Sequence, residues 1–416
     1  MGVINAVDLK PGMVLAEDLF GANQRFLLPK GTVIEESHLR IFKIWGVSEA
    51  EVQGVDRDQA MAEALAEMDP RVLQRAEELA DQLFIRVGLG QEAMQELHRL
   101  FILRTTRSIL AKEDMPKPAP PESMESGDPK DLFQDIPLPG DLVDHHLKLA
   151  SYPAIYQRLM EVLDHPRSTS AHLAEVLGKD PGLSAKLLKL VNSPYYGFPS
   201  TIDTIQRAVT LIGINELTTL ALGVSVIESF GSVPCELVDM ESCWKHSIAC
   251  GLLASFLAAR KPGVSEERFF VAGLLHDIGR LVLFARLPEQ MVWLIRRAWE
   301  DHVALEELEK QYLGFDHASL AGMLLNAWNL PDSLVRMIRF HHCPEQSPNP
   351  LEASVVHIAD TTSVALCFGQ SGTRLVPPIS SPAWNTLGLS PAALGQAASQ
   401  VERHFKEVAR TFFSPA

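Results

Sequence analysis

A histidine and an aspartate stand side by side, as His276 and Asp277, inside the apolar segment GLLHDIGRL. An imidazole and a carboxylate are costly to bury unless they are paired or bound to a metal ion. The apolar residues around them predict a buried helix from Phe269 to Leu283. On that helix the two side chains point about 100° apart, and both can still reach one cation beside it. The doublet alone is weak evidence, but it is the first indication of a metal site.

Two further candidate ligands lie on other segments that the sequence predicts to be buried helices. His246 lies in CWKHSIACGLLASFL, and Asp360 lies in SVVHIADTTSVAL. Imidazole nitrogens together with carboxylates suit manganese, iron, zinc or magnesium-like ions, and not zinc held by thiolates. We therefore expect His246, His276, Asp277 and Asp360 to bind a divalent transition-metal ion of the Mn, Fe or Zn type.

Three more histidines extend the candidate set. His317 lies in GFDHASLAG, and His341 and His342 end the segment LVRMIRF. These imidazoles could complete a second metal site, as in two-metal phosphoesterases, so we expect one or two ions. The alternative is that they are helix-end histidines that cap backbone carbonyls. His357 lies three residues before Asp360 and could face the same way. It either contacts the metal ligands from outside the site or packs in the core.

The elements that must position these residues are helices, so the predicted fold class is mainly α. From Leu138 onward the chain shows helical patterns with breaks at Asp180-Pro181 and Ser193-Pro194, and no convincing strand alternation. Residues 132–370 are predicted to form one all-helical domain, with Trp244–Ala259 and Leu351–Cys367 among its buried helices. Residues 371–416 are predicted to hold a loop rich in proline and serine and one last helix.

The segments before residue 132 predict three further units. Residues 1–56 show short apolar runs separated by turns, which predicts a small β-rich unit with a helix over Glu35–Trp45. Residues 57–112 are rich in good helix formers and predict a helical hairpin or a dimerising arm, so a homodimer is one possibility. Residues 113–131, EDMPKPAPPESMESGDPKD, have no apolar period and predict a disordered linker.

Composition narrows the classes of partner. The formal net charge of -15 disfavours a nucleic-acid binder and argues against docking on anionic membranes. The five cysteines have no ligand spacing, which favours reduced thiols. The N-terminus lacks the pattern of a signal peptide, and the sequence contains no uninterrupted apolar run of about 18 residues. We therefore expect a cytoplasmic protein.

The resemblance to a known family rests on several motifs. LAEVLGKDPGLSAKLLKLVNSPYYGF and IDTIQRAVTLIGINEL resemble the N-terminal half of the HDOD domain, while WKHS, FFVAGLLHDIGRLVL and FDHASLAGMLLNAWNLP resemble its second half. This resemblance covers residues 138–368. It implies a helical relative of the HD phosphohydrolases that serves as an output module in bacterial signalling, without a generally established activity. The His-His pair is followed by CPEQSPNP, so the glycine-tyrosine-proline signature of the HD-GYP phosphodiesterases is missing, which counts against hydrolysis of cyclic dinucleotides.

Two functions of different classes remain. The first is a regulatory signal-transduction module that responds to a protein partner or a nucleotide signal. The second is a metal-dependent phosphohydrolase, in which Asp277 would be the catalytic candidate because it would hold the metal that activates water. The loop NSPYYGF is expected to pack locally, with partner binding as the alternative.

Overall fold

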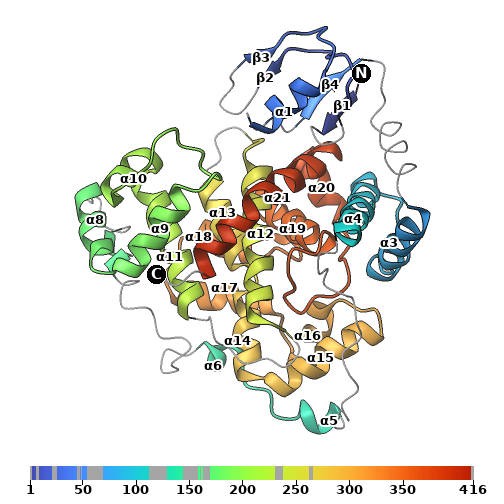
Figure 1. Ribbon diagram of the computed structural model, residues 1–416. Coiled ribbons are helices and arrows are strands. Elements are labelled where there is room, and N and C mark those ends of the chain that lie inside the picture. Colours follow the sequence, from blue (N-terminus) through green and yellow to red (C-terminus); the bar gives the residue numbers. More distant parts are fainter. Residues whose placement is uncertain are drawn as a thin grey trace.

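The computed structural model describes residues 2–5, 9–20, 26–44, 47, 49–53, 69–111, 129–143, 158–159, 161–162, 169–229, 238–261 and 266–413. Beyond residue 53, the described part of the chain contains helices and connecting segments but no strand. The mainly α fold class is therefore confirmed, with a small strand-containing unit at the N-terminus (Figure 1).

The N-terminal unit holds two small antiparallel sheets and one helix. Its elements are β1 (Gly2–Asn5), β2 (Leu19–Phe20), β3 (Phe26–Leu28), α1 (Glu36–Ile44) and β4 (Glu49–Val52). Strand β1 pairs with β4, and β2 pairs with β3. Leu15, Ile34, Phe42 and Val52 are buried in a hydrophobic cluster that is separate from the core of the helical body. The unit thus has its own small core.

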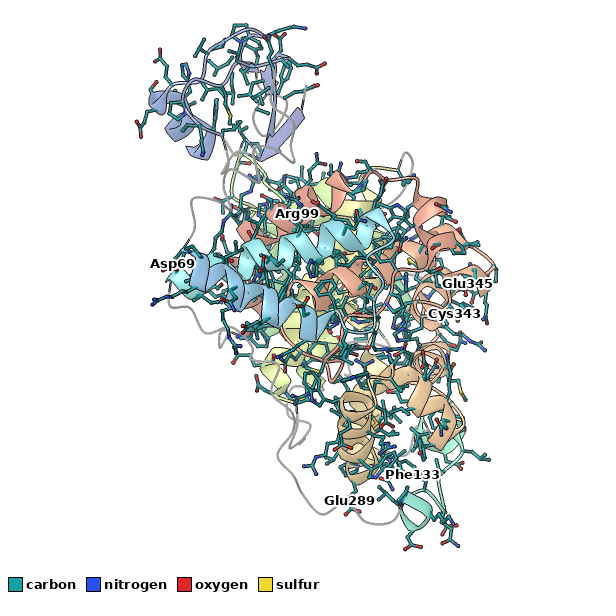
Figure 2. The ribbon with its side chains drawn as sticks, turned by 90° about the vertical axis from the view of Figure 1, so that its right-hand side faces the viewer. Asp69, Arg99, Phe133, Glu289, Cys343 and Glu345 are labelled. Carbon is teal, nitrogen blue, oxygen red and sulfur yellow. The ribbon has the colours of Figure 1, made fainter. Side chains whose placement is uncertain are left out.

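Two helices of the predicted hairpin, α3 (Pro70–Leu83) and α4 (Glu92–Ala111), pack against each other. Asp69 caps α3 by accepting a hydrogen bond from a backbone amide of the first turn, and the proline that follows fits there because it has no N–H to satisfy. Met94, Leu97 and Phe101 of α4 belong to the same hydrophobic cluster as the helices of residues 170–413. Figure 2 shows α3 and α4 lying across one face of the helical body, with Asp69 and Arg99 labelled. The hairpin is therefore part of the main core. The first residues of the predicted hairpin segment, 57–68, lie outside the described residues.

The predicted linker falls almost entirely outside the described residues, which resume at residue 129. Its last residues begin the short helix α5 (Pro129–Leu132), which precedes α6 (Pro139–Leu142). Phe133 packs its ring against Trp293 and Tyr312, and Gln290 donates a hydrogen bond to the carbonyl of Leu132. This segment thus crosses α15 (Pro288–Glu300) and α16 (Leu305–Leu313), close to Glu289 in Figure 2.

The first half of the large domain contains α8 (Ser170–Gly178), α9 (Pro181–Val191), α10 (Ile205–Ile212) and α11 (Ile214–Ser229). The NSPYYGF loop follows α9 and turns at Gly197, whose φ of 60° favours glycine. The Tyr195 hydroxyl lies 2.6 Å from the Ser255 Oγ, and its ring packs against Phe270. The loop therefore packs the first half of the domain against the second. This contact agrees with the prediction that the NSPYYGF loop packs locally.

The second half contains the candidate residues. Its helices are α12 (Met240–Ala258), α13 (Glu266–Leu275), α14 (Ile278–Arg286), α15, α16, α17 (His317–Ala327), α18 (Asp332–Arg339), the 3-10 turn η2 (Pro344–Gln346) and α19 (Pro350–Ala365). The prediction of one continuous helix over 269–283 was wrong, because the chain breaks at His276 and Asp277, between α13 and α14. Apolar residues continue on both sides of this break, so the apolar pattern does not predict it.

Helices α12 and α13 cross through two glycines. A Cβ at Gly251 would lie 2.6 Å from the Phe270 carbonyl oxygen, and a Cβ at Gly273 would lie 2.7 Å from backbone atoms of Cys250 and of Gly251. The absence of side chains lets the two backbones approach closely. This close crossing brings His246 on α12 next to His276 at the end of α13.

The chain ends with α20 (Ser381–Leu387) and α21 (Ala392–Phe413). The sequence predicted a loop where α20 lies. Ser380 caps this short helix by accepting a hydrogen bond from the Ala383 amide, and Pro382 lies in its first turn. Helix α21 packs on α4 and α12, which closes the core.

No single helix in the described ranges is long and apolar enough to cross a membrane, although the bent pair Ile205–Ile212 and Ile214–Val226, at 119°, passes the same test of length and composition.

Candidate metal centre

Four of the predicted ligands converge from three elements. The Nε2 atom of His246, on α12, lies 3.3 Å from the Nε2 atom of His276 and 3.1 Å from the Oδ1 atom of Asp360, on α19. Asp277 brings Oδ2 to 3.4 Å from the His276 Nε2 and to 3.8 Å from the His246 Nε2. Two ligands of one ion, each about 2.0–2.2 Å from it, lie about 3–3.5 Å apart. These separations therefore match the first coordination sphere of a single ion.

The Nδ1 atoms of His246, His276 and His341 contact protein oxygens on the outside of the cluster, so that their Nε2 atoms face the cluster. The Nδ1 of His276 donates to the Gly273 carbonyl at 2.7 Å, and the Nδ1 of His246 lies 3.1 Å from the Ser363 Oγ. The Nδ1 of His341 donates to the Ile338 carbonyl at 2.6 Å. Fixing Nδ1–H in this way leaves a lone pair on Nε2, which is how metal-binding histidines are oriented.

One of these lone pairs has no protein partner. The Nε2 atom of His341 is buried and makes no hydrogen bond, and it belongs to a group with His276 and Asp360 whose donor atoms lie within 4.8 Å of one another. Burial, followed by the nearby His276 and His317, lowers the pKa of His341 to about 3, so it is neutral at physiological pH. An unpaired, buried and neutral nitrogen beside carboxylates fits a metal ligand, so the residues present fit the implied metal ion.

A second group adjoins the first. His317, at the start of α17, and His342, in the turn after α18, bring their Nε2 atoms to 2.9 Å. Together with His341 they offer three ligand atoms within 4.8 Å of one another. The Oδ1 atom of Asp277 lies 3.1 Å from the His317 Nε2, so this carboxylate bridges the two groups. The structure thus gathers all seven predicted residues into one buried or half-buried cluster.

Two charged side chains complete this second group. Glu309, on α16, accepts hydrogen bonds from the backbone N–H of His317 at 2.8 Å and from its Nδ1 at 2.5 Å. Arg280, on the first turn of α14, places Nη1 at 2.9 Å from the Asp277 Oδ2 and Nη2 at 3.0 Å from the His317 Nε2. Both side chains are buried. The sequence prediction did not include them, although Arg280 stands three residues after Asp277, where helical spacing places it on the same side.

The pKa values follow from burial and from these charges. Burial alone would raise the pKa of Asp277, but the Arg280 guanidinium and His276 outweigh it and hold that pKa well below its usual range. Burial opposes the charged form of His276 as well, yet Asp277 raises its pKa well above the usual value. Without a cation in the cluster the carboxylates therefore retain a proton on His276. A metal ion must displace that proton in order to bind.

The cluster is enclosed by the loop that follows α19. Arg280 Nη1 donates to the carbonyl and the hydroxyl of Ser371, at 3.0 and 2.8 Å. The backbone N–H of Val376, further along this loop, donates to the Leu83 carbonyl at the end of α3. A cavity of about 20 Å³ lies between Leu83, His246 and this loop. That volume is enough for about one water molecule.

His357, considered above, and Lys245, which neighbours His246, lie outside the cluster. The Nδ1 of His357 donates to the His341 carbonyl at 2.8 Å, and its Nε2 accepts from the Ser380 amide at 2.9 Å. His357 therefore supports the turn that carries His341 and is not itself part of the cluster. Lys245, beside His246, forms an ion pair with Glu241 on the surface, 2.6 Å apart.

The fold and the cluster define an HD-type helical domain, in which a His-Asp doublet meets a histidine and an aspartate from flanking helices. Residues 149–344 match the family model of the HDOD domain, so the chain carries an HDOD domain.

Comparisons with other proteins agree with this fold. A crystal structure from Shewanella amazonensis SB2B, provisionally named a phosphohydrolase, is 24% identical with a TM-score of 0.53; it covers 65% of this chain and 97% of its own. An HDOD domain protein of unknown function from Geobacter sulfurreducens is 21% identical with a TM-score of 0.51, and covers 64% of this chain and 92% of its own. An uncharacterized protein of Treponema pallidum (strain Nichols) is 24% identical over 227 residues, which are 54% of this chain. The chain spans 44% of the length of that relative.

Proposed function

We propose that this HDOD domain is a cytoplasmic regulatory module of bacterial signal transduction, built around a bound divalent transition-metal ion, and that it does not hydrolyse phosphoesters. The observation that carries the proposal is the enclosure of the cluster. Its donor set suits a metal ion, while the adjoining cavity of about 20 Å³ is far smaller than the roughly 300–1,000 Å³ of sites that bind small molecules. A metal ion in this position would supply Lewis acidity, but a phosphoester would not fit in this cavity between the described residues.

The residues around the cluster suit a structural use of the metal. His246 on α12, the His276-Asp277 break and Asp360 on α19 come from separate parts of the chain, and the outermost two residues are 114 positions apart. A shared ion would fix these elements relative to one another. The loop over the cluster also contacts α3, so a change at the centre would be transmitted to the helical hairpin. Such coupling is what a module needs if it presents different surfaces to a protein partner.

A hydrolysis assay of the wild-type protein distinguishes this regulatory module from a metal-dependent phosphohydrolase. Cyclic dinucleotides, nucleoside phosphates and a generic phosphoester are tested with Mn²⁺, Fe²⁺ or Mg²⁺, on wild type, Asp277→Ala and the control Asp332→Ala, whose side chain is exposed. We expect no significant turnover by any of the three. Turnover of about 1 per second or more in wild type and in the control, lost in Asp277→Ala, would establish the enzyme instead.

A further inference from the structure

The guanidinium of Arg280 occupies the junction between the two groups of candidate ligands. It lies 2.9 Å from the Asp277 Oδ2, on the carboxylate that bridges the groups, and 3.0 Å from the Nε2 of His317, the first ligand of the second group. A metal ion bound by His317, His341 and His342 would need the His317 Nε2 lone pair and a carboxylate oxygen of Asp277. In the structure, the Nη2 atom of Arg280 lies 3.0 Å from that nitrogen. Its Nη1 atom donates a hydrogen bond to Asp277 Oδ2, while the other oxygen, Oδ1, lies 3.1 Å from the His317 Nε2.

The position of Arg280 is fixed from the other side as well. Nη1 also donates to the Ser371 carbonyl and hydroxyl, and it lies 3.2 Å from the Thr373 Oγ1. The residue is 1% exposed. A guanidinium held by several acceptors at once cannot leave without breaking them, and its charge persists at every physiological pH. Arg280 is therefore a permanent cation at this end of the cluster.

Charge balance indicates how many further cations the cluster needs. The buried carboxylates of Asp277, Asp360 and Glu309 bring three formal negative charges, and Arg280 brings one positive charge. One divalent ion makes this total zero when every imidazole is neutral, and each protonated imidazole adds one further positive charge. A second divalent ion would leave two positive charges uncompensated in a buried site, which is costly. Asp316, next to His317, is already paired with Lys310 at 3.0 Å and offers no further compensation.

We propose that Arg280 takes the place of a second metal ion, so that the centre binds one divalent ion, held by His246, His276, Asp277 and Asp360. His317, His342 and His341, which also belongs to the group with His276 and Asp360, then form a preassembled second group that a metal ion can enter only when the guanidinium is removed. This inference rests on the proposed metal centre and adds to it the number of ions and the residue that sets this number.

The test is the number of Mn²⁺ ions bound per chain by the full-length protein, measured by equilibrium dialysis with elemental analysis. Wild type is compared with Arg280→Gln, which keeps much of the length but not the charge, and with Arg280→Lys, which keeps the charge. Arg268→Gln is the matched control, because Arg268 is a partly buried arginine that pairs with Glu352 away from the cluster. Circular dichroism verifies that each variant is folded.

We expect one ion per chain in wild type, in Arg280→Lys and in Arg268→Gln, and two in Arg280→Gln. Electron paramagnetic resonance gives an independent readout, because two Mn²⁺ ions about 3.5–4 Å apart are exchange-coupled and a single ion is not. Coupled spectra should thus be seen only in Arg280→Gln.

Two ions in wild type would overturn this inference while leaving the metal centre itself intact. One ion in a folded Arg280→Gln variant would also overturn it. No ion in wild type would overturn the proposed metal centre together with the inference. If Arg280→Gln does not fold, the ion count and the spectrum of wild type still decide.

Discussion

Gly279→Ala is a substitution for which the structure predicts a large loss of stability from a single methyl group. Gly279 lies in the first turn of α14, where this helix crosses the start of α17. A Cβ at this position would lie 2.0 Å from the His317 carbonyl oxygen and 2.8 Å from the Ala321 backbone nitrogen. An ordinary carbon–oxygen contact is about 3.3 Å, so the two helices would have to separate by about 1.3 Å. Neither obstacle is a side chain that could rotate away.

Overpacking by single methylene groups in a core costs about 1–3 kcal/mol. Because the obstacles are backbone atoms, we expect the free energy of unfolding to fall by at least about 3 kcal/mol in Gly279→Ala. The assay is urea unfolding followed by circular dichroism at 222 nm. The same displacement would move His317 away from Asp277, whose Oδ1 now lies 3.1 Å from the His317 Nε2.

Gly178→Ala is the matched control. Gly178 ends α8 on the surface, and a Cβ there would meet no atom within 4 Å. Its substitution should change the free energy of unfolding by about 1 kcal/mol or less, because alanine is the better helix former. Equal stability of Gly279→Ala and Gly178→Ala would refute the close crossing of α14 and α17, and with it the account of how His317 reaches the cluster.

Three further predictions concern the site and the assembly of the chain. Ser363→Ala should weaken Mn²⁺ binding about 10- to 100-fold in titration calorimetry, because Ser363 orients His246 through Nδ1. Ser354 is a buried serine on the same helix, and Ser354→Ala should leave the Mn²⁺ affinity unchanged. Equal Mn²⁺ affinities of the two variants would be inconsistent with this role of Ser363. The Mn²⁺ affinity of wild type should fall by up to about tenfold per pH unit between pH 8 and 6, because the raised pKa of His276 makes the ion displace a proton; an affinity that does not depend on pH would contradict this. Limited proteolysis should cut within 113–131, where the sequence has much proline and no apolar period. The two fragments should still elute together in gel filtration, because α4 packs in the main core. Separation of the fragments would exclude that packing.

Sequence alone predicts the candidate ligands because they are exceptions to their surroundings. His246 and Asp360 are polar residues within apolar helices, and His276 lies in an apolar segment between two helices; such exceptions are visible in the chain. Arg280 and Glu309 escaped prediction because long charged side chains usually lie on helix surfaces. Only the tertiary fold shows that both are buried against His317.

The helix break at His276 and Asp277 was hidden for a related reason. Apolar residues continue on both sides of it, so the periodicity predicts one helix. Directly after the break, Gly279 comes close to the His317 carbonyl, which is distant in sequence. The packing of α4 against the main core was likewise not readable, because an apolar helix face does not indicate which surface covers it. Short α20 was missed because its pattern of serine and proline is equally typical of a loop.

The most direct test of the central claim is anomalous diffraction from crystals of protein purified with Mn²⁺. The account predicts one anomalous peak bounded by the Nε2 atoms of His246 and His276 and by the carboxylates of Asp277 and Asp360. It also predicts that Mn²⁺ at 100 times its dissociation constant stabilises the protein by about 2.7 kcal/mol. The absence of a peak among these four side chains, with a melting temperature that does not respond to Mn²⁺, would contradict the claim that this cluster is a metal centre.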